Sequence, residues 1–395
     1  MTATNLRLFF IYILFILGAL LSANQNAVLY ILIYVLSLTL NNFKTLLLGV
    51  SFLIPLFFLL FIGMLSFGNN PDYFFLRDIW FILKTILLTL TGINLCYGIN
   101  EKEFIKICLT VGVISLFISV FSLLLNILSG YGAGELRQLV SLKTMPFVAG
   151  IIILQTFPRT FKILFLILML ITLLFEASAT ASLFFILMLY FAFFRSLSNM
   201  IIYGLLLVFP ALVLINIVYP LDFFGSWVAE LNPISWFTNV NQDFNANWRG
   251  FEAYLGLIQY SELSLIEQIF GAGHGSSIDL PFRIGLGGIS ADESVLFTDL
   301  QIIHNGFILV LYKYGLAGLV LIIYYLFSMI RYINQFANRK VSSMVITYMT
   351  FSTIAILVTF PVLSGLFNPK YLDDVVLLFG MFYGMSINWK KIEQS

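Results

Sequence analysis

Charged residues are scarce in this chain of 395 residues. Asp, Glu, Lys and Arg together make up 10% of it, whereas hydrophobic residues make up 61%. An ordinary soluble domain has about 25% charged and about 45–50% apolar residues. So few polar side chains could not cover so much apolar surface, which excludes a soluble globular protein. The composition predicts an integral membrane protein that crosses the bilayer many times.

Excess positive charge and cysteine clusters are also missing. A net charge of +1 provides no basic stripe, so no nucleic-acid partner is expected. The two cysteines, Cys96 and Cys108, each lie in an apolar run without a CxxC or Cys/His pattern. A disulfide framework and a structural zinc site are therefore not expected.

Long apolar runs dominate what is present. They are near-continuous and lack the period-two alternation of an outer-membrane barrel, so helices are favoured. A spanning helix needs about 20 residues, and some runs are shorter. The sequence predicts an all-α fold: a polytopic membrane helix bundle of about twelve transmembrane helices with one large, partly helical periplasmic loop. The twelve predicted spans are 8–22, 27–41, 45–67, 79–98, 104–128, 145–157, 161–176, 181–195, 199–219, 304–328, 343–364 and 371–388.

The runs divide the chain into three parts. Residues 1–219 form an N-terminal transmembrane bundle of about nine spans, 220–303 the large loop, and 304–395 a C-terminal bundle of about three spans. Lys and Arg concentrate on the cytoplasmic side of membrane proteins. If the N-terminus is cytoplasmic, twelve basic residues fall inside and six outside. Both termini are then expected in the cytoplasm and the large loop outside.

The large loop is the segment where chemistry is expected. Its aromatic residues argue against disorder, and 251–270 has apolar residues at helical spacing, which predicts one helix lying on the membrane or capping the bundle. A glycine-rich turn follows, with Gly271, Gly273 and His274. Two interpretations of this turn stay open: a flexible connection, or close backbone approach to a phosphate-bearing ligand.

Histidine and arginine provide the candidate reactive groups. His304, followed by Asn305, stands where the loop enters the tenth span, where an imidazole can transfer protons near neutral pH. The alternative is an interfacial histidine bonded to a backbone carbonyl. Arg137, Arg249 and Arg283 lie on the outer side, and their planar donors suit pyrophosphate oxygens, although a lipid headgroup or surface ion pair is the alternative for each.

Three further ionisable residues fall within predicted spans. Lys84 and Glu176 lie near span ends, which favours snorkelling to the interface. Lys313 lies nine residues beyond His304, deep enough that it is expected to face protein or water.

The order of these features is familiar. Arg249, a helix, Phe270-Gly271-Ala272-Gly273, His304-Asn305 and Tyr314-Gly315-Leu316-Ala317-Gly318 together resemble the O-antigen polymerase and O-antigen ligase superfamily of bacterial inner membranes. Leu136-Arg137-Gln138 through Pro146-Phe147-Val148-Ala149-Gly150 is similar to the arginine loop of that family. Two features depart from it: 176–180 lacks the arginine of a common Ser-Arg pair, and Lys313 stands where an acid is common.

The resemblance implies a metal-independent glycosyltransferase of the cell inner membrane, with its active site in the periplasm. The substrates would be oligosaccharide repeat units linked to undecaprenyl pyrophosphate. No cofactor is implied, and a chain-length regulator protein and membrane lipids are the partners to consider. The implied catalytic residues are His304, Arg249 and Arg137. The implied substrate-binding residues are Arg283, Asn305, Gly271, Gly273, His274 and Lys143.

Three functions remain open. The idiosyncratic, aromatic-rich sequence favours a polymerase of surface polysaccharide. The first alternative is a ligase that transfers the glycan to lipid A–core. The second is a transporter (flippase) of lipid-linked oligosaccharides, for which internal repeats and paired broken helices would be expected; the sequence shows neither.

Overall fold

The computed structural model describes residues 3–20, 23–38, 43–65, 72–129, 144–176, 179–193, 248–285, 296–300, 302–337, 343–362, 365 and 372–392. Most of them are helical. The predicted span 199–219 lies outside the described residues. The helices are α1 (Ala3–Leu20), α2 (Ala23–Leu38), α3 (Phe43–Leu65), α4 (Asp72–Cys96), α5 (Glu101–Leu128), α7 (Thr144–Thr156), α8 (Arg159–Glu176), α9 (Ala179–Phe193), α12 (Trp248–Glu262), α13 (Leu265–Phe270), α14 (Gly306–Ala337), α15 (Ser343–Val362) and α16 (Leu372–Ile392).

Three helical segments are long and apolar enough to cross a membrane. They are Tyr73–Cys96, Glu101–Leu128 and Gly306–Gln335, and six shorter apolar helices accompany them within the described residues. These helices suggest a membrane protein and agree with a mostly helical fold. The expected number of about twelve transmembrane helices is not confirmed.

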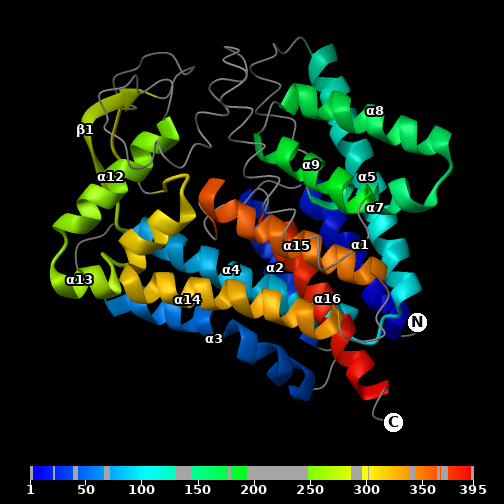
Figure 1. Cartoon of the computed structure of the whole chain (residues 1–395), viewed down its shortest axis with the longest axis horizontal. Coiled ribbons are helices and arrows are strands. Elements are labelled where there is room, and N and C mark those ends of the chain that lie inside the picture. Colours follow the sequence, from blue (N-terminus) through cyan, green and yellow to red (C-terminus); the bar gives the residue numbers. More distant parts are fainter. Residues whose placement is uncertain are drawn as a thin grey trace.

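Helices from the two ends of the sequence pack into one bundle (Figure 1). The closest packing is between α4 and α16. A Cβ added at Gly380 would meet the backbone of Thr89, and one at Gly384 would meet the backbone of Ile93. Glycines at these positions let the two backbones approach closely, as in many membrane helix pairs. The described helices of 1–219 and of 304–395 therefore share one packed core.

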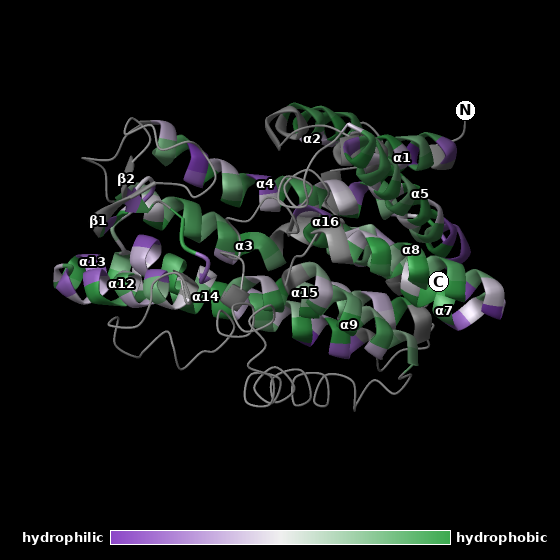
Figure 2. Cartoon of the chain, turned by 90° about the horizontal axis from the view of Figure 1, so that it is seen from above, coloured by the Kyte–Doolittle hydropathy of each residue, from purple (hydrophilic) through white to green (hydrophobic). Residues whose placement is uncertain are grey.

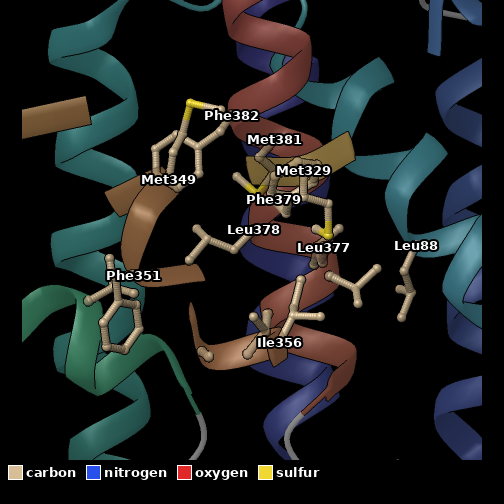
Figure 3. Close-up of a cluster of buried hydrophobic side chains, with 14 of the residues drawn as sticks. Leu88, Met329, Met349, Phe351, Ile356, Leu377, Leu378, Phe379, Met381 and Phe382 are labelled. Atoms are coloured by element: carbon tan, nitrogen blue, oxygen red, sulfur yellow. The ribbon is translucent and has the colours of Figure 1, made fainter. Parts of the chain in front are cut away.

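That core lies between α4, α14, α15 and α16. Figure 3 shows Leu88 of α4, Met329 of α14, Met349 of α15 and Leu377 of α16 within one cluster of apolar side chains. All four side chains are buried. Figure 2 shows that hydrophobic residues predominate along these helices.

One end of the bundle carries α12, α13 and the strands (Figures 1 and 2). The single helix expected over 251–270 is wrong, because α12 ends at Glu262 and α13 begins at Leu265. Ser264 caps α13: its hydroxyl accepts from the Glu267 amide, and the Glu267 carboxylate accepts from the Ser264 amide. This Ser-x-x-Glu capping box starts a new helix at Ser264 and explains the break.

A small antiparallel sheet accompanies the helices, in the segment expected to be a partly helical loop. Its strands are β1 (Ile278–Gly285) and β2 (Leu296–Leu300), with Ile278 opposite Leu300 and Gly285 opposite Leu296. Apolar residues alternate along β1, a period-two pattern typical of a strand with one buried face. They are Ile278, Leu280, Phe282 and Ile284.

Lys84 does not snorkel as expected. Its ammonium lies 2.7 Å from the carboxylate of Asp373 on α16, and both side chains are largely buried. Lys84 therefore ties α4 to the first turn of α16. Glu176 is the last residue of α8, and its side chain lies outside the described part of the structure.

Candidate active site

The first turns of α12 and the segment before α14 bring Glu252 and His304 together. Nδ1 of His304 lies 2.7 Å from Oε2 of Glu252, and the same oxygen accepts the backbone N–H of His304 at 2.9 Å. The Glu252 side chain is 2% exposed, whereas the His304 side chain is 43% exposed. A buried carboxylate thus holds an imidazole that remains accessible from outside.

This geometry determines which ring nitrogen is basic. An ionised carboxylate only accepts hydrogen bonds, so Nδ1 of His304 carries the proton that it donates to Glu252. In the neutral ring Nε2 is then the unprotonated nitrogen. Among the described residues Nε2 has no hydrogen-bond partner. The arrangement can take a proton from a hydroxyl that approaches Nε2, as the carboxylate-oriented histidine of a catalytic triad does.

Asn305 caps the N-terminal end of α14. Its side-chain oxygen accepts the backbone N–H groups of Phe307 and Ile308, both at 3.1 Å, and it is almost fully buried. Asn305 is therefore the N-cap of α14. The ring of His304 is held by Glu252 and not by Asn305.

The structure describes the three arginines and Lys143 only in part or not at all. Arg249 is the second residue of α12, three residues before Glu252, and Arg283 lies in β1; their side chains are outside the described part. Arg137 and Lys143 lie outside the described residues altogether. Their expected contacts with a pyrophosphate stay predictions.

The glycine-rich turn packs into a break in α14. Gly315 interrupts that helix with φ 65° and ψ −168°. A Cβ on Gly315 would collide with the backbone of Ile269, and one on Gly271 would collide with the backbone of Lys313. Gly271 and Gly273 have φ of 86° and 89°, values that favour glycine. Close backbone packing between the turn and α14 thus explains Gly271 and Gly315, and the positive φ explains Gly273.

The amides of the turn are already used within the protein. Those of Ala272 and Gly273 donate to the carbonyls of Tyr312 and Lys313, both at 2.9 Å, and the amide of His274 donates to the carbonyl of Gly63. These bonds satisfy carbonyls that the break in α14 releases. The turn is a buried joint and not a flexible connection, and its bonded amides do not form the phosphate cradle that was the other interpretation.

His274 is part of this joint. It is fully buried, its Nε2 lies 3.1 Å from the carbonyl of Leu60, and its Nδ1 lies 3.1 Å from the hydroxyl of Tyr314. A carbonyl cannot donate, so Nε2 carries the proton and Nδ1 accepts from Tyr314. Burial lowers the pKa of His274. A neutral ring with both nitrogens bonded inside the protein leaves no group to bind substrate, so the substrate-binding assignment of His274 is not supported.

Lys313 faces protein, as one of the two expectations had it. Its ammonium lies 2.5 Å from Oδ2 of Asp78 on α4, and neither side chain is exposed. The same oxygen accepts the amide of Gly275 at 2.8 Å, and Arg77 lies 3.5 Å from Oδ1. Asp78 therefore joins α4, α14 and the glycine-rich turn.

Sequence reasoning missed Glu252 and Asp78. Glu252 stands three residues after Arg249 in an otherwise apolar stretch, and Asp78 stands in an apolar run beside Arg77. An acid in such a context needs a partner, which is the signal that could have found both. Within the described residues, no group of three His, Cys, Asp or Glu side chains is placed to hold a metal ion.

Comparisons with known proteins add no family. No protein-family model matches the chain, and no curated protein matches it either.

Proposed function

We propose that this chain is a membrane glycosyltransferase of the O-antigen polymerase type, which joins oligosaccharide repeat units linked to undecaprenyl pyrophosphate. The observation that supports this proposal best is the Glu252–His304 pair. A buried carboxylate holds Nδ1 of an accessible histidine at 2.7 Å and leaves Nε2 as a base.

In the proposed reaction His304 acts on the acceptor sugar. Nε2 removes the proton of the acceptor hydroxyl as its oxygen attacks the anomeric carbon of the donor. The bond between that carbon and the pyrophosphate oxygen breaks, and the lipid pyrophosphate leaves with the electron pair. Glu252 stabilises the imidazolium that forms, and the proton then passes to solvent or to the leaving group.

The arginines would stabilise the leaving group. Two developing negative charges on a pyrophosphate are well matched by guanidinium groups, which stay charged and donate two bonds at once. Arg249 lies one helical turn before Glu252 on α12, which supports its assignment to this role. Arg137 and Arg283 are assigned by the sequence pattern alone.

A transfer assay with the purified chain tests the proposal directly. The purified chain in lipid nanodiscs is supplied with a lipid-pyrophosphate-linked oligosaccharide, and product length is read on a gel. His304→Ala should lower transfer by about 10²–10⁴-fold, the usual contribution of a general base. Glu262→Ala, at the exposed last residue of α12, serves as the control. Transfer by His304→Ala within about threefold of the unaltered chain contradicts the assignment of His304 as a base.

Polymerase and ligase share this chemistry and differ in the acceptor. A second lipid-linked repeat unit as acceptor gives a ladder, whereas lipid A–core gives a single transfer. The composition supports the polymerase, and supplying each acceptor separately distinguishes the two.

The location follows from the same proposal. The chain would lie in the bacterial inner membrane with both termini cytoplasmic and 220–303 periplasmic, since basic residues divide twelve to six in favour of that orientation. A reporter enzyme that works only in the periplasm should be active when it is fused at Asn241. Activity of a cytoplasm-specific reporter fused at Asn241 would show that the chain has the opposite orientation in the membrane.

One observation favours a transporter as the second candidate. Transporters bind substrate at interrupted helices, and α14 is interrupted at Gly315 beside the buried Lys313–Asp78 pair. However, the glycine-rich turn occupies this break and bonds its carbonyls, which makes the break a weaker site than the Glu252–His304 pair. Movement of a fluorescent lipid-linked oligosaccharide across vesicles, without a longer product, would favour the transporter.

A further inference from the structure

Helix α13 leaves an apolar face uncovered. The side chains of Leu265 and Ile266 are 75% and 71% exposed, and those of Ile269 and Phe270 are also exposed. Residues three and four apart are neighbours on a helix surface, so Ile269 lies beside both Leu265 and Ile266, and Phe270 lies beside Ile266. A cluster of four large apolar side chains on one small helix is unfavourable in water and marks a contact surface.

The polar residues of α13 lie on the other side of the helix, and this side bonds to the protein. Gln268 donates to the carbonyls of Ser261 and Leu263, and its own carbonyl accepts from the hydroxyl of Tyr260. Glu267 closes the capping box with Ser264. The polar side is thus held by the end of α12, and the apolar side is the one that remains free for a partner.

The residues at and after the C-terminal end of α13 fix the position of this helix along the bundle. Gly271 and Gly315 let α13 and the break in α14 touch backbone to backbone. The amides of Ala272 and Gly273 bond the carbonyls of Tyr312 and Lys313. Helix α13 therefore lies beside Gly315 and cannot move along α14 without breaking these bonds.

Exposed apolar faces of two long helices end at this level. On α14 the face begins directly after Gly315, with side chains three and four residues apart: Leu316, Val320, Ile323, Tyr324 and Phe327. On α3 the corresponding face runs up to the last turn, with Ile54, Phe58, Phe61 and Leu65. The neighbouring residue Gly63 contacts His274, so the end of α3 and the glycine-rich turn meet. Figure 1 shows α13 beside the start of α14.

We propose that α13 is an interfacial helix whose partner is the lipid bilayer. The Leu265 and Ile266 face enters the boundary between headgroups and acyl chains, where amphipathic helices bury their apolar side by about 5–10 Å. The continuity with the exposed faces of α3 and α14 selects the bilayer as the partner, because those faces belong to helices apolar enough for a membrane. Contact with lipid holds α12, and with it Glu252, at the membrane surface. This proposal does not depend on glycosyl transfer.

Depth-dependent fluorescence quenching tests the proposal in the full chain. Ile266→Cys is labelled with bimane and reconstituted in phosphatidylcholine vesicles that carry a nitroxide at carbon 5 or carbon 12 of the acyl chain. Glu262→Cys, exposed at the end of α12, is the aqueous control, and Val320→Cys is the lipid control. The native Cys96 and Cys108 are buried, and labelling of the unaltered chain measures their background.

We expect stronger fluorescence quenching of the label at position 266 than of the label at position 262. The shallow nitroxide should quench the label at position 266 at least about twofold more than the label at position 262, whereas position 320 should respond more to the deep nitroxide. Quenching at 266 no greater than at 262 overturns the proposal. Disulfide-linked dimers of Ile266→Cys would overturn it as well, because a second copy would then cover the face. If Ile266→Cys inserts poorly, Leu265→Cys replaces it.

Discussion

The carboxylate of Asp78 and the ammonium of Lys313 lie 2.5 Å apart, although 235 residues separate them in the sequence. Neither side chain is exposed. The pair connects α4 to α14 about two turns from the start of α14, and the amide of Gly275 shares the same carboxylate oxygen. One buried contact therefore fixes the relative position of three segments around the candidate active site.

Removal of one member of this pair should destabilise the protein strongly. Asp78→Ala removes the carboxylate that faces Lys313, and Lys313→Met leaves Asp78 beside Arg77 but without the nearer ammonium; breaking a buried ion pair costs about 3–5 kcal/mol. We expect each single variant to unfold at clearly lower temperature in detergent than the unaltered chain. The double variant should lose less than the sum of the two single losses, because no charge is then left unpaired. Purely additive losses would mean that the two residues do not interact.

Gly315→Ala should separate α13 from the break in α14. The added methyl group would collide with the backbone of Ile269, and φ of 65° is strained for alanine. We expect a loss of more than about 1 kcal/mol in stability and faster proteolysis of the chain near α13. Leu316→Ala, which changes an exposed neighbour, is the matched control. Equal protease sensitivity in both variants would argue against a tight contact at Gly315.

His274 should make stability depend on pH. Burial lowers the pKa of His274 in the folded protein, whereas in the unfolded chain it titrates near its ordinary value of about 6.5. Above about pH 7 the ring is neutral in both states and contributes no pH dependence. As the pH falls below about 6.5, only the unfolded chain takes up the proton, so stability falls until the lower pKa of the folded state is reached.

Thermal unfolding between pH 7.5 and pH 5 checks this effect. In His274→Gln the amide nitrogen can still donate to the carbonyl of Leu60, and the part of the pH dependence due to His274 should disappear. The groups that face the ring are Asp78, Lys313 and Tyr314, and they are unchanged in this variant. A pH dependence identical to that of the unaltered chain would show that His274 does not cause it.

Glu252→Gln tests the orientation of His304 separately from the presence of the base. The amide keeps the shape of the side chain but loses the charge and no longer enforces the proton on Nδ1. We expect transfer to fall by about 10²–10⁴-fold with little change in folding, as when the carboxylate of a catalytic triad is replaced by an amide. Glu262→Gln makes the same change at an exposed position of the same helix and should behave like the unaltered chain. Comparable activity in the two variants would remove Glu252 from the site.

Helices, helix ends and strands could be predicted where the residues that determine them lie close together in the sequence. The apolar runs predicted helices, and most of them occur in the structure. The Ser-x-x-Glu pattern at Ser264 and the alternation along β1 carried equally local signals for the break and the strand. Those two features were predictable in principle, because a capping box and a pleated strand depend on residues two or three positions apart.

The partners of the polar groups were not predictable in this way. The sequence indicated His304 and suggested Asn305 as its neighbour, yet Glu252, 52 positions away, holds the ring. It indicated a deep Lys313 but not Asp78. It marked the turn of Gly271 and Gly273 as a flexible connection or an approach to a ligand, whereas the backbone of α14 requires glycine at 271 and φ of 89° favours glycine at 273.

The sequence by itself determined that this is a mostly helical, apolar chain suited to a membrane, because composition and helical periodicity depend only on which residues follow one another. Tertiary structure alone decided which charges pair, where α14 breaks, which histidine is buried and which remains accessible. The physical reason is that a buried ionisable group is stable only beside a complementary group, and that group comes from whichever helix packs next to it in space. No local pattern around His304 or Lys313 specifies that neighbour.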